Sequence, residues 1–264
     1  MSTRRSPLVF FGMPEQTTHA GLWLDKYVRD QTRDDVESRH QLVQQVAGIP
    51  EPDFYPGFFQ RWKDALAGCG AVLREARVQG RMVIGMGNES VLETAVTLHR
   101  TYGVPYIPGS ALKGLAAAYA RQRLDQATWG EGSAAYNIVF GTATNTAPAA
   151  AAPDLDDGGA AGYVTFFDAL PTPNQRGPLL HADVLTVHHP AYYRGEQDVP
   201  PADWDSPTPI PFLSATGTYL VALAGPEAWL ERTFEILQRA LREMGVGAKT
   251  SSGYGRLLLH PPGG

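Results

Sequence analysis

The segment between Pro226 and Gly245 carries the most regular hydrophobic pattern in the chain and constrains the fold more than any other stretch. Its apolar side chains recur at intervals of three and four residues, as on one face of an α-helix: Leu230, Phe234, Leu237, Leu241 and Met244. Gly245 then supplies a typical helix stop. Apolar runs at 217–223 and 254–259 flank the segment and are predicted to be strands. The C-terminal part is therefore predicted to run strand, helix, strand.

A second helix is predicted over about 110–124. Pro108 and Gly109 interrupt what precedes it, and Ser110 is a good N-cap because its hydroxyl can accept a bond from an unpaired amide one turn on. Lys113 in the first turn opposes the helix dipole, so free amides and an ammonium at one place would form an anion site. The alternative is a solvated lysine whose stem covers apolar surface. The expected buried stripe is Leu112, Leu115, Ala116 and Tyr119.

Two more strands are predicted, from a glycine-bounded apolar run at 81–87 and from a β-branched and aromatic run at 162–169. The resulting order of strand, helix, strand, strand, helix, strand is the ferredoxin-like pattern, which RNA-recognition modules share. We therefore expect an α+β fold with a ferredoxin-like (RRM-like) βαββαβ core over 76–264.

The rest of the chain is predicted to decorate this core. Residues 1–75 contain helical segments near 22–28, 34–47 and 58–66, which make them a helical N-terminal addition. The stretch 143–161 is rich in Ala, Pro, Asp and Gly and is expected to be a flexible insert. Residues 170–211 contain many prolines and are expected to be irregular.

The composition is that of a globular protein. Of 264 residues, 43% are apolar and 19% are charged, and the net charge is −5. An acidic chain has no overall field that attracts nucleic acid, so any anion site must be a local patch. Cys69 is the only cysteine, which excludes an internal disulfide and fits a reducing, cytoplasmic setting; we expect it to be buried. No apolar run reaches the length of a membrane span, so no membrane partner is expected.

The loop between Gly245 and Arg256 gathers glycines and hydrogen-bond donors. Its glycines, Gly245, Gly247, Gly253 and Gly255, let a backbone pass close to another chain. Its donors are Lys249, Thr250, Ser251, Ser252 and Arg256, and Tyr254 offers a ring on which a base could stack. Such a loop suits a ribose–phosphate backbone, and the alternative is an ordinary flexible turn. It is not a nucleotide P-loop, because Glu243 stands where the first glycine belongs and the loop follows a helix.

A second cluster of aromatic and basic side chains consists of His188, His189, Tyr192, Tyr193 and Arg194. We predict that it contacts RNA, with a buried aromatic cluster as the structural alternative. A metal site is disfavoured, because adjacent histidines in a strand point to opposite sides and no carboxylate or cysteine lies at ligand spacing. Neither a metal nor a cofactor is expected. Asp168 and Asp25 are the best lone carboxylates for general-base chemistry, although each also suits a structural position.

Two of these segments together resemble the RAMP superfamily of CRISPR-associated RNA-binding proteins. Ile107–Gly114 resembles the element that opens that family's first helix, and Gly247–Arg256 resembles its glycine-rich loop before the last strand. Within the superfamily, the sixth subunit of the type III-B (Cmr) effector complex is similar in further stretches: Leu92–Thr94, Leu98–Arg100, Tyr102–Pro108, Asp183–Thr186, His189, Tyr192–Tyr193 and Gly247–Thr250. The resemblance runs from about Gly21 to the C-terminus, apart from the insert.

The resemblance implies a single RAMP domain, 1–264, that is a structural subunit and not an enzyme. Such a subunit holds the 3′ part of the guide RNA (crRNA) and caps the row of backbone RAMP subunits. It also touches the small subunit and the neighbouring terminal RAMP, with target RNA as a further partner. The region at about 183–215 would be a thumb that presses on the guide–target duplex. The expected RNA-binding residues are Ser110, Lys113, His188, His189, Tyr192, Tyr193, Lys249, Thr250, Ser251, Ser252, Tyr254 and Arg256.

Two other functions stay open. One is a metal-independent ribonuclease that processes guide-RNA precursors, with a histidine such as His188 as its acid or base. The other is a purely protein-binding scaffold.

Overall fold

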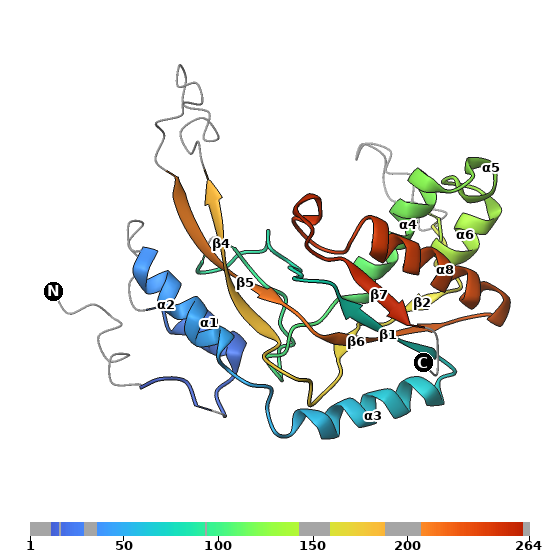
Figure 1. Ribbon diagram of the computed structural model, residues 1–264. Coiled ribbons are helices and arrows are strands. Elements are labelled where there is room, and N and C mark those ends of the chain that lie inside the picture. The colour runs from blue at the N-terminus through green and yellow to red at the C-terminus, as the bar shows by residue number, and fades with distance from the viewer. Residues whose placement is uncertain are drawn as a thin grey trace, which may run out of the picture.

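The computed structural model describes residues 12–15, 17–28, 36–92, 94–142, 159–187 and 207–260. Its centre is a five-stranded antiparallel sheet with the order β2 (Thr165–Phe166), β6 (Thr218–Ala224), β1 (Val72–Val78) and β7 (Leu257–His260), and β3 (Leu170–Pro171) also pairs with β6. A two-stranded ribbon of β4 (Leu180–Val187) and β5 (Thr208–Ala215) projects beside the sheet (Figure 1).

The sheet is covered on both faces beside its strand β6. Tyr219, Val221 and Leu223 belong to the larger hydrophobic cluster, which α4 (Gly109–Arg123) and α8 (Glu227–Glu243) complete. The alternate residues Leu220 and Ala222 belong to a second cluster, which α3 (Tyr55–Gly68) completes. Figure 1 shows α3 on one side of the sheet and α4 and α8 on the other. Burial on both faces explains why β6 is apolar throughout.

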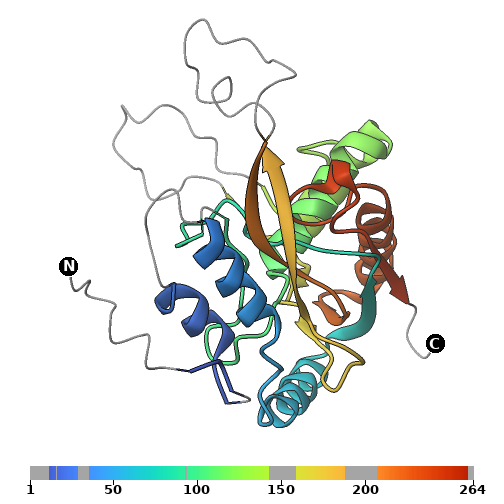
Figure 2. The same ribbon diagram turned by 60° about the vertical axis from the view of Figure 1, so that its left-hand side comes forward.

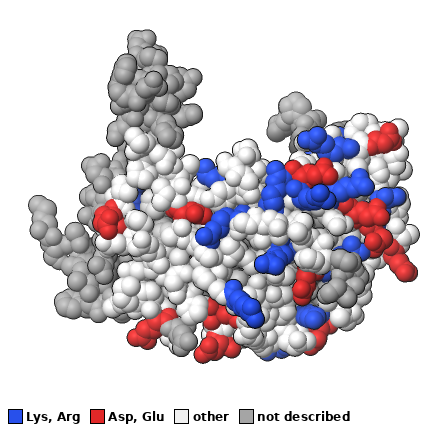
Figure 3. Space-filling model, in the orientation of Figure 1, with Lys and Arg blue, Asp and Glu red and all other residues white. Residues whose placement is uncertain are grey.

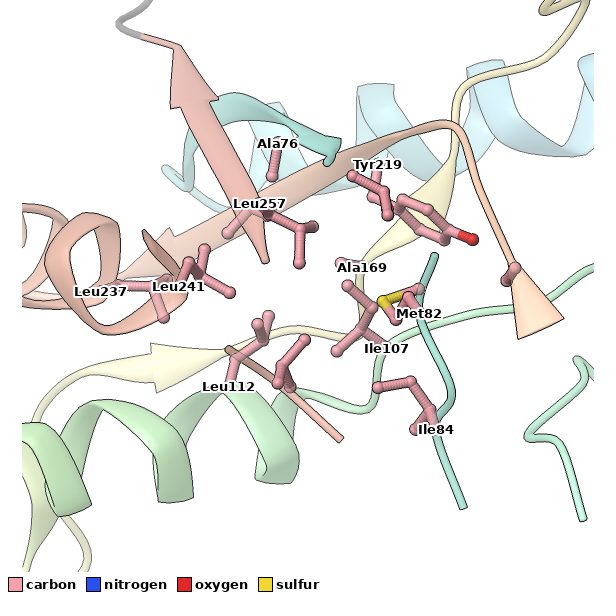
Figure 4. Close-up of a cluster of buried hydrophobic side chains, with 14 of the residues drawn as sticks. Ala76, Met82, Ile84, Ile107, Leu112, Ala169, Tyr219, Leu237, Leu241 and Leu257 are labelled. Atoms are coloured by element: carbon pink, nitrogen blue, oxygen red, sulfur yellow. The ribbon is translucent and has the colours of Figure 1, made fainter. Parts of the chain in front are cut away.

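The two long helices agree largely with the sequence pattern. α8 buries the predicted stripe, including Leu237 and Leu241, and Figure 4 shows these side chains directed toward Leu112 and Leu257. α4 buries Leu112, Ala116 and Tyr119, while Leu115 packs half-buried against the same cluster. The predicted strands at 217–223 and 254–259 are confirmed as β6 and, in their last residues, β7.

The start of α4 differs from the prediction. The helix begins at Gly109 with Pro108 as its N-cap, and Ser110 is exposed and makes no cap bond, so its assignment as N-cap was wrong. The Asp168 carboxylate fills this role and accepts a hydrogen bond of 2.7 Å from the Gly109 amide. A side chain on Gly109 would collide with the carbonyl of Phe166, so the helix can approach β2 this closely only with glycine there.

The first strand of the sheet also differs from the prediction. It is β1, whereas residues 81–87 contain only an isolated bridge from Met82 to Ala215. The alternation of β1 is hidden in the sequence because Arg74 occupies a buried position. That arginine donates to Glu231 of α8 at 2.6 Å and lies 4.2 Å from the Phe234 ring centroid, which compensates its burial.

The strand predicted at 162–169 is interrupted, and the region predicted to be irregular, 170–211, is partly ordered. Within 162–169 only Thr165 and Phe166 pair with β6, because Ala169 turns away to bridge Ile107. The expectation that 170–211 is irregular was wrong for β3, for β4 and for the start of β5. Prolines are tolerated in β5 because it pairs with β4 along one side only, so alternate positions have no ladder bond to lose.

The remaining helices lie around this core. They are α1 (Ala20–Lys26), α2 (Val36–Ala47), α5 (Gln126–Trp129) and α6 (Ala134–Phe140). Figure 2 shows α2 beside the β4–β5 ribbon, and Leu42, Val43 and Leu213 belong to one cluster there. Cys69 is exposed at the end of α3, so the prediction of its burial was wrong. Across the described ranges, no helix is long and apolar enough to cross a bilayer. Most of the predicted insert, 143–158, lies outside the described residues.

Candidate nucleic-acid interface

The glycine loop, residues 245–256, is fixed by backbone hydrogen bonds to the segment Arg81–Ile84. The amide of Gly255 donates to the Arg81 carbonyl, and the amide of Ala248 donates to the Val83 carbonyl, each at 2.8 Å. Gly247 has a φ of +86°, and a side chain there would collide with the Val83 carbonyl. The backbone of the loop is therefore held in one conformation and needs glycine at 247 to approach the Val83 carbonyl, which argues against an ordinary flexible turn.

The tip of the loop presents donors to solvent. Lys249 adopts a left-handed conformation with φ of 57°, and a 3₁₀ turn, Thr250–Ser252, follows it. Ser251 and Ser252 are exposed, while Lys249 and Thr250 are half-buried. The guanidinium of Arg256 donates to the carbonyls of Arg242 and Thr250, both at 3.4 Å, and so lies between the loop and the end of α8.

Tyr254 ties the loop to the β4–β5 ribbon. Its hydroxyl donates to the Asp183 carboxylate at 3.2 Å, and Ser214 donates to the same oxygen at 2.5 Å. The Tyr254 ring lies 6.1 Å from that of Phe212, measured between centroids. Burial raises the pKa of the Tyr254 hydroxyl, and the charge of Asp183 raises it further. Sequence reasoning missed this link, and stacking of a base on Tyr254 stays a prediction.

The first turn of α4 offers a smaller set of donors than expected. The Gly109 amide is taken by Asp168, and the amides of Ala111 and Leu112 donate to the Pro108 carbonyl. Ser110 is exposed, and Lys113 is half-buried with no acidic partner in the described part of the chain. An anion there would be held by the Ser110 hydroxyl and the Lys113 ammonium.

The helix start and the glycine loop border the same segment of chain. Leu112, which precedes Lys113, shares a hydrophobic cluster with Ile84, and Figure 4 shows Leu112, Ile107 and Ile84 gathered around one space. A side chain on Gly247 would also contact Ile84. In Figure 3, Lys and Arg side chains gather over α8 and the loop that follows it, with acidic side chains among them. Both motifs therefore adjoin the larger hydrophobic cluster, and a shared binding surface for Lys113 and the loop stays a prediction.

Comparison with known proteins bears on this region directly. The family model described as the RAMP superfamily matches residues 75–258, which include the second half of β1, all of α4 and α8, and the glycine loop. The chain belongs to the RAMP superfamily.

Individual relatives narrow the likeness within this superfamily. The chain is 33% identical over 255 residues to the CRISPR system Cmr subunit Cmr6 of Pyrococcus furiosus, with 78% of this chain and 73% of the relative covered. In a cryo-EM structure of the type III-B Cmr-beta complex bound to cognate target RNA, one chain is 21% identical; the match has a TM-score of 0.62 and covers 84% of this chain and 71% of that chain. The crystal structure of Pyrococcus furiosus Cmr6 is 31% identical, with a TM-score of 0.39 and coverage of 72% and 98%.

The remaining predicted residues of this RAMP chain lie where the structure says nothing. His188, His189, Tyr192, Tyr193 and Arg194 fall in the undescribed stretch between β4 and β5. Within the described ranges, no group of three or more His, Cys, Asp or Glu side chains lies together as a metal site would require. The RNA contacts predicted for these five residues are therefore not tested by the structure.

The two candidate general bases occupy different positions. Asp168 caps α4 through the Gly109 amide, which is a structural role. Asp25 is exposed on α1 and lines a cavity of about 600 Å³ together with His19, His99 and Arg100. Burial lowers the pKa of His99, although the charge of Asp168 acts in the opposite direction.

Proposed function

We propose that this RAMP protein is a guide-RNA-binding structural subunit of a type III-B CRISPR ribonucleoprotein. In that complex it holds the 3′ part of the crRNA and caps the row of backbone RAMP subunits, next to the small subunit and the neighbouring terminal RAMP. Its homology to Cmr6 and its fold likeness to a chain of the Cmr-beta complex support this assignment.

We further propose that the core is ferredoxin-like. The order β2-β6-β1-β7 supports this, as does the placement of α4 between β1 and β2 and of α8 between β6 and β7. In an RNA-recognition module bases stack on the open face of the sheet. Here α3 covers that face beside β6, through Leu220 and Ala222. RNA would therefore be held by the loops at the ends of the strands and not on the sheet.

The observation that supports the proposal most is the fixed glycine loop with its exposed donors, together with Lys113, which has no acidic partner among the described residues. Lys249 and the hydroxyls of Ser251 and Ser252 stand at the tip of a loop whose backbone is held by Arg81 and Val83. Such donors recognise phosphate and ribose and not base identity. This fits a protein that grips a guide whose own pairing supplies sequence recognition.

We propose that the chain has no catalytic role. The carboxylate of Asp168 is engaged by the first amide of α4, and that of Asp183 is engaged by Ser214 and Tyr254. Both groups thus have structural roles, which supports this proposal.

The guide-binding proposal is tested with the chain's four lysines. Lys113→Ala with Lys249→Ala removes the two at the proposed site, and Lys26→Ala with Lys63→Ala removes the two exposed ones elsewhere. In a reconstituted complex, the first pair should weaken crRNA retention and reduce its salt slope by about 1.4, at about 0.7 for each phosphate contact on a single strand. The second pair should match wild type. Equal retention and slope in both pairs would contradict the proposal.

The ribonuclease alternative is separated by incubating the purified chain with repeat RNA, with and without a chelator. We expect no cleavage. Cleavage that survives the chelator and is lost in His188→Ala would establish the alternative.

A further inference from the structure

A cavity of about 520 Å³ lies where β1 ends and β6 begins. Two arginines, Arg77 and Arg176, line it together with neutral residues that include Gln175, Thr216 and Thr218, and no carboxylate belongs to its lining. Both arginines are exposed, and neither has an acidic partner within the described ranges. Two unpaired guanidinium groups beside one polar cavity, in a chain of net charge −5, are an unusual local concentration of positive charge.

The loop that carries Arg176 is held in place by Gln175. The Gln175 side-chain nitrogen donates to the carbonyls of Thr172 and Thr218 at 2.7 and 2.9 Å, and its oxygen accepts from the Thr218 amide at 2.6 Å. The Thr216 hydroxyl adds a bond to the Pro178 carbonyl at 3.1 Å. The cavity wall is therefore fixed before any ligand arrives, which lowers the entropic cost of binding.

Gly217 shapes the floor of the cavity. Its carbonyl accepts from the Val78 amide at 2.9 Å, and its φ is +107°. A side chain there would come within 2.8 Å of the Gln175 oxygen and would disturb the bonds that hold the loop. Gly217 and the side chain of Gln175 therefore fix the shape of this part of the cavity.

The cavity and the glycine loop share one short segment of backbone. Val78 and Gly80 line the cavity, whereas the neighbouring amide of Gln79 donates to the Arg256 carbonyl at 2.7 Å and the Arg81 carbonyl accepts from Gly255. The backbone of the glycine loop and the wall of the cavity therefore adjoin the same short segment, residues 78–81, which bends at Gln79 and Gly80 after β1 ends.

We propose that this cavity is a second phosphate subsite, which takes one phosphodiester of the same RNA strand that the glycine loop holds. The inference rests on the proposed function, because it extends that RNA path. The guanidinium groups of Arg77 and Arg176 bind the phosphate oxygens, and the hydroxyl of Thr218 provides a neutral polar contact to the adjoining ribose. Phosphate is favoured over an acidic peptide because the cavity adjoins the segment that holds the proposed RNA-binding loop, and guanidinium groups bind phosphate oxygens well.

The test uses Arg77→Ala with Arg176→Ala in the reconstituted complex. The control pair is Arg61→Ala with Arg232→Ala, which removes exposed arginines from α3 and α8. Because one phosphate contact is lost, the salt slope of crRNA retention should fall by about 0.7 in the first pair and stay at the wild-type value in the control. Photocrosslinking with 4-thiouridine-substituted crRNA should also yield peptides that contain residues 174–179.

Three results would overturn the subsite. One is an unchanged salt slope in the Arg77/Arg176 pair together with a reduced slope in the Lys113/Lys249 pair, which leaves the guide-binding proposal intact. Another is a normal slope with loss of a neighbouring subunit, which would assign the cavity to an acidic protein partner. The third is an unchanged slope in both the arginine and the lysine pairs, which would also contradict the guide-binding proposal.

Discussion

The variants Gly247→Ala and Gly253→Ala test separately why the loop contains glycine: for its left-handed backbone, or for its close approach to Val83. Both glycines have left-handed backbones, with φ of +86° and +88°. At Gly253 a side chain would meet open space, whereas at Gly247 it would collide with the Val83 carbonyl and contact Ile84. The pair therefore holds the backbone conformation constant and varies only the close approach.

The magnitudes follow from these surroundings. A left-handed alanine costs about 1–2 kcal/mol, and the reduced freedom of the unfolded chain returns about 0.4–1 kcal/mol, so Gly253→Ala should cost at most about 1.6 kcal/mol. Gly247→Ala must also displace the Val83 carbonyl, which accepts from Ala248 at 2.8 Å. Losing that bond and leaving a buried polar group unpaired adds about 1–3 kcal/mol. We therefore expect Gly247→Ala to cost about 1–3 kcal/mol more than Gly253→Ala.

Urea unfolding of both variants measures these costs, and crRNA retention in the reconstituted complex measures their effect on the site. Gly247→Ala should lose both stability and retention, while Gly253→Ala should stay close to wild type in each. If the two variants cost the same within error, the close approach to Val83 does not fix the loop, and the reasoning is refuted.

Three further predictions concern stability and its dependence on pH. Arg74→Ala should lower the free energy of unfolding, measured in urea, by about 2–4 kcal/mol because it removes a buried cation–π contact and an ion pair. Glu231→Gln should lower it by under about 1 kcal/mol because the Glu231 side chain is largely exposed. A larger loss for Glu231→Gln than for Arg74→Ala would contradict this. Burial lowers the pKa of His99 and of His181 in the folded state. The stability that the neutral side chains confer is therefore complete above their pKa in the unfolded chain, about 6.5, and is lost as the pH falls through the folded-state pKa. The His99→Asn/His181→Asn variant should therefore lose less stability than wild type between pH 7.5 and 5.5, and an identical loss would show that these groups do not titrate on unfolding. Burial raises the pKa of Tyr254, so the stability that its neutral hydroxyl confers is complete below about pH 10 and is lost as the pH rises through the folded-state pKa. Tyr254→Phe should therefore reduce the loss of unfolding free energy between pH 9 and 11. The same loss in the variant and in wild type would contradict the assignment.

Helix periodicity and apolar runs predicted the parts of the fold whose local pattern agrees with their burial. α8 and β6 are such parts, because every buried position in them is apolar or small apart from Thr233. β1 was missed because Arg74 is buried, and only its contacts with Glu231 and Phe234, more than 150 residues away, make that position tolerable. A pattern confined to one segment cannot contain such a partner.

The sequence predicted which residues form the candidate site but not the contacts that hold them in place. The donors of the glycine loop are visible in the sequence, but the support from Arg81 and Val83 is not, since both were assigned to a strand of the sheet. The cap of α4 was assigned to Ser110 because N-cap rules look along the chain, whereas Asp168 arrives from a segment 59 residues on. The link from Tyr254 to Asp183 is long-range in the same way.

The central claim is that the glycine loop and the first turn of α4 hold the same sugar–phosphate strand. Its most direct test is photocrosslinking of the assembled complex with 4-thiouridine crRNA, followed by mass spectrometry of the crosslinked peptides. We expect crosslinks from adjacent nucleotides near the 3′ end to peptides that contain residues 247–256 and 107–114. Crosslinks confined to α3 and the N-terminal helices, with neither of these peptides recovered, would contradict the claim.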